Sequence, residues 1–162
     1  MAGMGKRTSR PGPVWAAVGA VGFVGVTGVA GGIEMILYPR GNQFVDGDWL
    51  AGIPLIDSYR VPGLVLAGGI GGGATAACLG LLRRPHVNLL VPVEQRTGQH
   101  WSWAATRLTG GALSVWLLTE LLLIPDRSAV EAVYAAAALA LLGLPALPSF
   151  RDYTALPVPV SG

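Results

Sequence analysis

Four apolar runs, each about as long as a bilayer is thick, constrain the fold of this chain more than any other feature. The hydrocarbon core of a membrane needs about 20 apolar residues in helical form. The four runs contain 24, 21, 22 and 20 residues, and few of the charged residues, which are only 12% of the chain, fall inside them. We therefore predict four transmembrane helices, at residues 14–37, 62–82, 103–124 and 130–149.

The same runs define the domain organisation and the orientation. A four-helix transmembrane domain, residues 14–149, lies between a short N-terminal segment, 1–13, and a tail, 150–162. Lys6, Arg7 and Arg10 lie in the N-terminal segment. The connection 83–102 contains Arg83, Arg84 and Arg96, and the tail adds Arg151, whereas the arginines of the connection 38–61 are mixed with aspartates. Basic residues in short loops face the cytoplasm. The sequence thus predicts an all-α, polytopic bundle of two hairpins, with both termini and residues 83–102 inside and residues 38–61 outside.

The first apolar run has an alternative interpretation. Basic residues from Lys6 to Arg10, then the apolar run, then Gly28-Val29-Ala30 also have the layout of a cleavable signal peptide. The apolar character continues to Leu37, which favours a spanning helix.

A weak internal repeat supports the division into two hairpins. At an offset of 86 residues, three pairs of otherwise scarce residues align: Trp15 with Trp101, Glu34 with Glu120 and Pro39 with Pro125. Both hairpins would enter the membrane from the cytoplasm, so the repeat is parallel and not inverted.

Glu34 and Glu120 are the candidate functional carboxylates. Each lies inside an apolar run, near its external end. A carboxylate in a spanning segment is costly and normally faces the interior of a bundle or water. One hypothesis is a proton- or cation-responsive pair; the other is two interfacial carboxylates that hydrogen-bond to neighbouring helices.

Small residues recur at a spacing of four, which lets helix backbones approach closely in a membrane. The run 62–82 contains more glycine than one interface needs, which indicates a partner. The candidate helix-packing glycines are Gly28, Gly32, Gly68, Gly72, Gly69 and Gly73.

Arginines and tryptophans gather where the runs meet the cytoplasm. Arg83, Arg84 and Arg107 are the candidate ligands of lipid headgroups, because a long cationic side chain can extend to the interface. Amphipathic indole rings also favour this level. We expect three of them there: Trp15, Trp101 and Trp103.

Several classes of function lack support in the residues. No basic stripe with stacking aromatics indicates nucleic-acid binding, and Cys78, the single cysteine, allows no intrachain disulfide. His86 and His100 are expected to be solvated or interfacial, and no nucleophile and base are recognisable. We therefore predict no catalytic residue, cofactor or metal. Asp46, Asp48 and Asp57 of the connection 38–61 do not have the spacing of a calcium-binding loop.

Two segments resemble a bacterial protein family. They are Pro39-Arg40-Gly41 and the segment 57–64, Asp-Ser-Tyr-Arg-Val-Pro-Gly-Leu. The chain resembles small four-helix membrane proteins, common in actinobacteria, in which Pro-x-Gly follows the first helix and an Asp-Tyr-x-x-Pro-Gly-Leu-like segment opens the second. Here Ser58 stands between the Asp and the Tyr, and Leu55-Ile56 replaces the usual Pro-Phe. The resemblance implies a multi-pass protein of the bacterial cytoplasmic membrane, and no residue role comes with it.

Three functions remain as hypotheses. The first is a non-enzymatic structural or accessory membrane protein that packs against itself or a larger membrane complex through the helix 62–82. The alternative is a small proton- or cation-coupled transporter that uses Glu34 and Glu120. The third is a membrane enzyme acting on lipids, which would depend on the loop aspartates.

Overall fold

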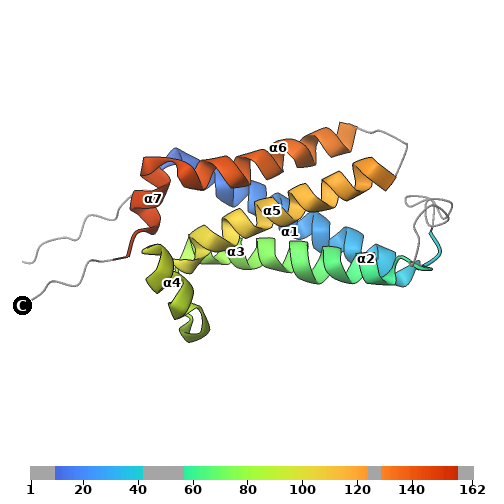
Figure 1. Ribbon diagram of the computed structural model, residues 1–162, viewed down its shortest axis with the longest axis horizontal. Coiled ribbons are helices and arrows are strands. Elements are labelled where there is room, and N and C mark those ends of the chain that lie inside the picture. The colour runs from blue at the N-terminus through green and yellow to red at the C-terminus, as the bar shows by residue number, and fades with distance from the viewer. Residues whose placement is uncertain (1–9, 42–56, 124–128, 157–162) are drawn as a thin grey trace, which may run out of the picture.

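The computed structural model describes residues 10–41, 57–123 and 129–156, and these parts of the chain form an all-helical bundle (Figure 1). Within them, the β-type pairing is limited to one isolated bridge, between Gln99 and Ala155. The all-α fold class is confirmed.

Long helices make up the body of the bundle. The first is α1, Gly12–Leu37. The second is continuous through three segments: α2, Arg60–Leu64, the π-helical η2, Val65–Gly71, and α3, Gly72–Arg83. The last two are α5, Trp101–Leu123, and α6, Ala129–Gly143, which a 3₁₀ turn extends over Leu144–Ala146.

Three of these helices are long and apolar enough to cross a membrane: Gly12–Leu37, Arg60–Arg83 and Ala129–Ala146. The helix α5 has 23 residues but is not among them. Its sequence includes Ser102, Thr106, Arg107, Thr109 and Glu120, which lower its mean hydropathy. Three of the four predicted spans are therefore confirmed as candidates, and the fourth stays a prediction.

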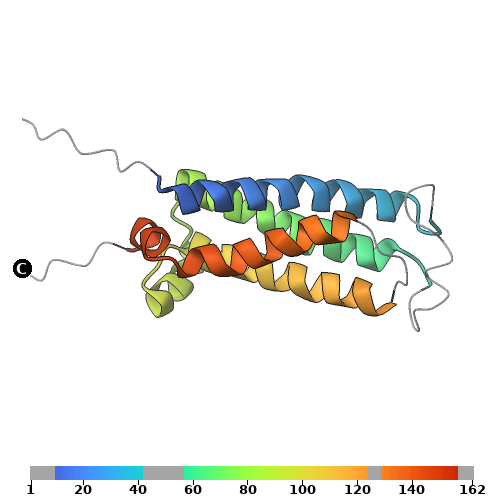
Figure 2. The same cartoon turned by 90° about the horizontal axis from the view of Figure 1, so that it is seen from above.

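The helices pack so that α1 and α5 lie on a diagonal of the bundle (Figure 2). The helix α1 contacts the Arg60–Arg83 helix and α6, and α5 contacts α3 and α6. The shared core is apolar. Its fully or almost fully buried side chains include Val21, Val24, Ile70, Ala74, Leu113 and Leu141.

Glycines bring α1 against the Arg60–Arg83 helix. A Cβ atom added at Gly28 would lie 3.2 Å from Cα of Gly71, and one added at Gly32 would collide with Ala67. A Cβ at Gly25 would lie 2.8 Å from the Thr75 hydroxyl oxygen. The α1 side of this contact thus includes Gly28 and Gly32, two of the candidate helix-packing glycines, with the backbones close enough to exclude side chains.

Short helices close one end of the bundle. The connection 83–102 contains a 3₁₀ turn, Asn88–Leu90, and α4, Val91–Thr97. The predicted run 130–149 ends earlier, because Pro145 lacks the backbone N–H that a helix needs. A separate helix, α7, Pro148–Thr154, follows where we expected a tail, with Phe150 completely buried beneath it.

The outside of the bundle is apolar. Large side chains on all of the long helices point away from the core, among them Val26 (73% exposed), Leu64 (62%), Leu122 (76%) and Leu139 (71%). Such continuous apolar surface is unfavourable in water and typical of contact with a membrane. Together with the three apolar helices, it indicates a membrane protein.

Candidate functional site

The two ends of the bundle differ in charge. The end formed by the start of α1, α4 and α7 contains six of the described arginines against the carboxylates of Glu94 and Asp152. Among the described residues, the opposite end contains two arginines and four carboxylates: Arg40, Arg60, Glu34, Asp57, Glu120 and Glu131. We call these the basic end and the acidic end.

Glu34 and Glu120 both lie at the acidic end and are partly buried. They come from α1 and α5, the helices on the diagonal, so they do not face each other across one helix contact. The Trp116 side chain hydrogen-bonds to the Glu120 carboxylate, and the Glu131 carboxylate at the start of α6 lies close enough to interact with it. The near neighbour of Glu120 is therefore Glu131, which the sequence did not indicate.

An open pocket of about 560 Å³ lies at this end, lined by residues 37–41 and by Asp57, Ser58 and Arg60. Neither Glu34 nor Glu120 lines it. Asp57 belongs to the described residues, whereas Asp46 and Asp48 lie outside them. The described residues contain no group of three or more His, Cys, Asp or Glu side chains that could hold a metal ion.

The four candidate packing glycines on the second helix, unlike Gly28 and Gly32, make no close contact with another described helix. A Cβ added at Gly68 or Gly69 would meet nothing within 4 Å, and one at Gly72 would meet only Ala67 of its own helix, at 3.6 Å. At Gly73 it would lie 3.9 Å from the Thr109 hydroxyl, an ordinary contact distance. The contact with α1 is made instead by Gly71, where a Cβ would lie 2.6 Å from the Val29 nitrogen.

The predicted headgroup arginines lie at the basic end and are exposed. The guanidinium of Arg107 stacks on Trp103, with Cζ 5.1 Å from the ring centroid, and Trp103 is partly buried. Trp15 is 51% exposed, as expected for an interfacial ring, but Trp101 is only 7% exposed and was wrongly predicted to lie at the interface. Its indole N–H donates to the Pro85 carbonyl oxygen at 2.9 Å, which holds the ring inside the bundle end.

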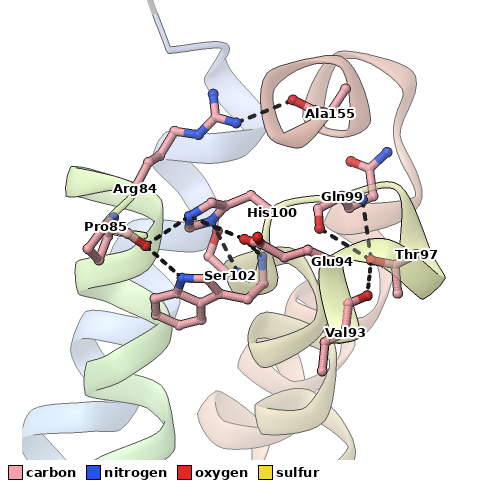
Figure 3. A network of polar contacts seen from close by, with 10 residues as sticks. Arg84, Pro85, Val93, Glu94, Thr97, Gln99, His100, Ser102 and Ala155 are labelled. Atoms are coloured by element: carbon pink, nitrogen blue, oxygen red, sulfur yellow. Dashed lines mark hydrogen bonds and ion pairs between the residues drawn. The ribbon is translucent and has the colours of Figure 1, made fainter. Parts of the chain in front are cut away.

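A buried polar network at the basic end is the best-defined arrangement of chemistry-bearing groups in the chain (Figure 3). It joins α4, the start of α5 and the segment after α3. Glu94, 7% exposed, accepts the backbone N–H of Trp101 at 3.1 Å, and this N–H is one that the first turn of α5 cannot satisfy. Its carboxylate also lies 3.8 Å from Nε2 of His100.

His100 occupies the position just before α5 and is 6% exposed, although we expected a solvated or interfacial ring. Its Nδ1 accepts the backbone N–H of Ser102 at 3.3 Å and lies 2.9 Å from the Ser102 hydroxyl oxygen. Because Nδ1 is an acceptor, the proton of the neutral ring is on Nε2, which donates to the Pro85 carbonyl oxygen at 3.3 Å. The histidine therefore acts as an N-cap, a role usually filled by Ser, Thr, Asp or Asn.

Burial lowers the pKa of His100 below its ordinary value of 6.5. The hydrogen bond to Pro85 and the negative charge of Glu94 oppose this shift, while the positive charge of Arg84 adds to it. The neutral ring is also the form that the cap requires, since only an unprotonated Nδ1 accepts a hydrogen bond.

The order Ser102, His100, Glu94 is that of a nucleophile, a base and an acid, which the sequence analysis did not anticipate. Ser102 is completely buried, however, so no substrate carbonyl can reach its hydroxyl. The Glu94 oxygen is 3.8 Å from His100 but 3.1 Å from the Trp101 nitrogen, so its closer partner is the helix start. The arrangement is suited to capping α5 and not to catalysis.

The network also holds α7 against the bundle. The backbone N–H of His100 donates to the Thr154 carbonyl oxygen at 2.7 Å, and the Thr154 hydroxyl donates to Oε1 of Gln99 at 2.6 Å. The backbone N–H of Leu156 donates to the Gly98 carbonyl oxygen at 3.2 Å. Helices α4, α5 and α7 are thereby fixed to one another by the residues between Glu94 and Ser102.

No family model, curated protein or solved structure matches this chain. The resemblance to bacterial four-helix membrane proteins therefore stays a prediction.

Proposed function

We propose that this chain is a four-span accessory protein of a bacterial cytoplasmic membrane, which binds a partner helix and catalyses no reaction. The partner would pack on the second span, along a surface that we call the glycine face: Gly68, Gly69, Gly72 and Ala76. One observation carries the proposal, namely that this surface combines glycine with an absence of close contacts inside the described chain.

The fourth span of this proposal is α5, and the placement of its polar groups supports it. Thr106 and Thr109 face the core, with 0% and 4% exposure, and each hydroxyl donates to the carbonyl oxygen four residues earlier. A hydroxyl satisfied in this way adds little cost in a membrane. With 23 residues at 1.5 Å each, α5 is about 34 Å long, enough for a hydrocarbon core of about 30 Å.

The proposed orientation rests on the charge difference between the ends. The basic end has the arginine excess of a cytoplasmic face, and it contains the start of α1 and the helix α7 near the C-terminus. Both termini would then lie in the cytoplasm, with the acidic end outside.

Exposed glycines inside a helix carry a cost in free energy. In a helix, glycine is less favourable than alanine by about 1 kcal/mol. At Gly28, Gly32 and Gly71 the close approach of two backbones offsets this cost. At Gly68 and Gly69 no neighbouring atom of the described chain uses the space. A second molecule that packs at backbone distance would use it.

The flanks of the glycine face fit a helix in the membrane. Leu64, Val65 and Leu79 are 62%, 50% and 43% exposed and line the same helix. None of the residues from Val61 to Leu82 is charged. The glycine face and its flanks are therefore apolar, and we expect the partner that packs on them to be a transmembrane helix.

The test is a pair of matched substitutions. Gly68→Ile with Gly72→Ile fills the glycine face, whereas Gly19→Ile adds the same side chain at an exposed glycine of α1 that likewise has nothing within 4 Å. Each protein is extracted in a gentle detergent, and its assemblies are weighed by native mass spectrometry. We expect the double variant to lose the assembly and Gly19→Ile to keep it. An assembly that persists in the double variant would refute the proposed surface.

The alternative proposal is a small proton- or cation-coupled transporter that uses Glu34 and Glu120. The observation in its favour is the proximity of the Glu120 and Glu131 carboxylates, since two such groups can share a proton or a cation. The diagonal placement of Glu34 weighs against a joint site. Glu120→Gln separates the two proposals, because a transporter would lose transport while an accessory protein would keep its assembly.

A further inference from the structure

Three separate segments of the chain meet around Tyr153 at the basic end. Arg10 precedes α1, Arg84 directly follows α3, and Tyr153 belongs to α7. The Tyr153 hydroxyl donates to the Leu81 carbonyl oxygen at 2.8 Å and accepts from Nε of Arg10 at 3.2 Å. The ring of Tyr153 is thus held in place by both neighbouring segments.

The two arginines flank this tyrosine. Arg10 also donates from Nη2 to the Leu82 carbonyl oxygen. The Cζ atom of Arg84 lies 5.3 Å from the centroid of the Tyr153 ring, and its Nη2 donates to the Ala155 carbonyl oxygen at 3.3 Å. The protein therefore holds two guanidinium groups at one side chain, with Arg10 at its hydroxyl and Arg84 over its ring.

Neither guanidinium has a carboxylate partner among the described residues: the one ion pair found there joins His100 and Glu94. A guanidinium carries five N–H donors. Hydrogen bonds to other described residues use two of these donors in Arg10 and one in Arg84. Two positive charges with spare donors, both in contact with Tyr153, form a ready site for an oxyanion.

The position of this site, at the basic end of the bundle, indicates which anion it meets. All three arginine–aromatic contacts of the described chain lie at this end, including Arg10 over the half-exposed Trp15, at 5.2 Å from the ring centroid. Half-exposed tryptophan and arginine at the end of an apolar helix are typical of the headgroup level of a membrane. The anions found at that level are lipid phosphates, and arginine forms paired hydrogen bonds with phosphate.

We propose that Arg10 and Arg84, positioned by Tyr153, bind the phosphate of an anionic phospholipid in the cytoplasmic leaflet. The inference rests on the membrane placement and orientation given above, but not on the glycine face or on any partner. It is more specific than general attraction of basic residues to a membrane, because the two arginines come from segments 74 residues apart and share one tyrosine.

The test compares lipid retention in single variants. Arg84→Gln removes one guanidinium whose hydrogen bond to the Ala155 carbonyl oxygen is on the surface, so the fold should survive. Arg60→Gln is the matched control, an exposed arginine at the acidic end. Delipidated protein is mixed with equal amounts of phosphatidylglycerol and phosphatidylcholine, and bound lipid is counted by native mass spectrometry. We expect the unmodified protein to prefer phosphatidylglycerol, and Arg84→Gln to bind it about tenfold more weakly.

Two further arms complete the experiment. Tyr153→Phe keeps the ring beneath Arg84 but loses the hydroxyl that contacts Arg10, so it should weaken phosphatidylglycerol retention less than Arg84→Gln does. Excess inorganic phosphate should leave the bound lipid in place; displacement by phosphate would identify a soluble anion as the ligand and overturn the lipid assignment. Equal losses in Arg84→Gln and Arg60→Gln, or no loss in Arg84→Gln, would also overturn it.

Discussion

The Nδ1 atom of His100 accepts the backbone N–H of Ser102 at 3.3 Å, so this histidine caps the helix that it precedes. Glu94 satisfies the neighbouring N–H, that of Trp101, from a separate helix. The start of α5 therefore depends on two side-chain acceptors, and His100 can serve as one only while its Nδ1 is unprotonated. This makes the basic end sensitive to pH.

We predict that stability falls as the solution becomes acidic. The pKa of His100 is lower in the folded chain than its ordinary value of 6.5, because burial disfavours the charged ring. The stability contributed by the neutral ring is thus fully present above the unfolded-state pKa. It is lost as the pH falls from that value toward the lower folded-state pKa. Thermal unfolding in detergent between pH 8 and pH 5, values chosen to bracket 6.5, measures this as a falling Tm.

His100→Asn provides the control for this prediction. Asparagine is a good N-cap and does not titrate near neutral pH. The variant should unfold at nearly the same temperature as the unmodified protein at pH 8 and lose most of the pH dependence. An unchanged pH dependence would assign the effect to another group.

Glu94 should contribute to stability as a cap and not through its charge. Glu94→Ala removes the acceptor of the Trp101 N–H, and loss of a capping acceptor costs about 1 to 2 kcal/mol. Glu94→Gln keeps an acceptor oxygen, so it should cost less. The free energy of unfolding, measured by denaturant titration, distinguishes the two variants, and equal losses would contradict the capping role.

Neighbouring glycines of the same π-helical stretch should respond in opposite ways to alanine. A Cβ at Gly71 would lie 2.6 Å from the Val29 nitrogen, so Gly71→Ala should destabilise the fold by about 1 to 3 kcal/mol. Gly68→Ala meets nothing and should be neutral, or stabilise the chain by up to about 1 kcal/mol. The measurement is unfolding of the two variants in a detergent that first dissociates the assembly to monomers. Similar losses would mean that Gly68 is packed within the chain.

If the chain is an accessory protein, Glu34 and Glu120 should tolerate substitution by glutamine. Glu34→Gln and Glu120→Gln, singly and together, should leave the mass of the native assembly unchanged. Growth of the host under an imposed proton gradient, with and without the variants, checks the transporter alternative. Loss of growth in Glu120→Gln, with the assembly intact, would favour the transporter.

The long helices could be predicted because their pattern is local. A continuous apolar run between charged residues leaves few alternatives, and the predicted starts and ends of the first three helices lie within two residues of the observed ones. The close packing at Gly28 and Gly32 could also be predicted from a local pattern, because helices that pack closely in membranes have small residues at that spacing. The glycines of the second helix also formed a recognisable pattern, but it did not reveal which ones face α1.

The basic end could not be predicted because its contacts join distant segments. Nothing near His100 in the sequence indicates that Pro85, 15 residues earlier, supplies an acceptor for its ring. Trp101 aligns with Trp15 in the internal repeat, yet it is buried where Trp15 is exposed, because α4 and the segment after α3 cover it. The capping pattern was also missed, since the usual capping residues do not include histidine.

The central claim, that this chain acts by binding another transmembrane helix, is tested most directly in the native membrane. The protein is extracted in a gentle detergent, its native mass is measured, and every co-migrating chain is identified. The proposal predicts a stoichiometric assembly, with itself or with a larger complex, that Gly68→Ile with Gly72→Ile dissolves and Gly19→Ile does not. A bare monomer in the unmodified protein would contradict it.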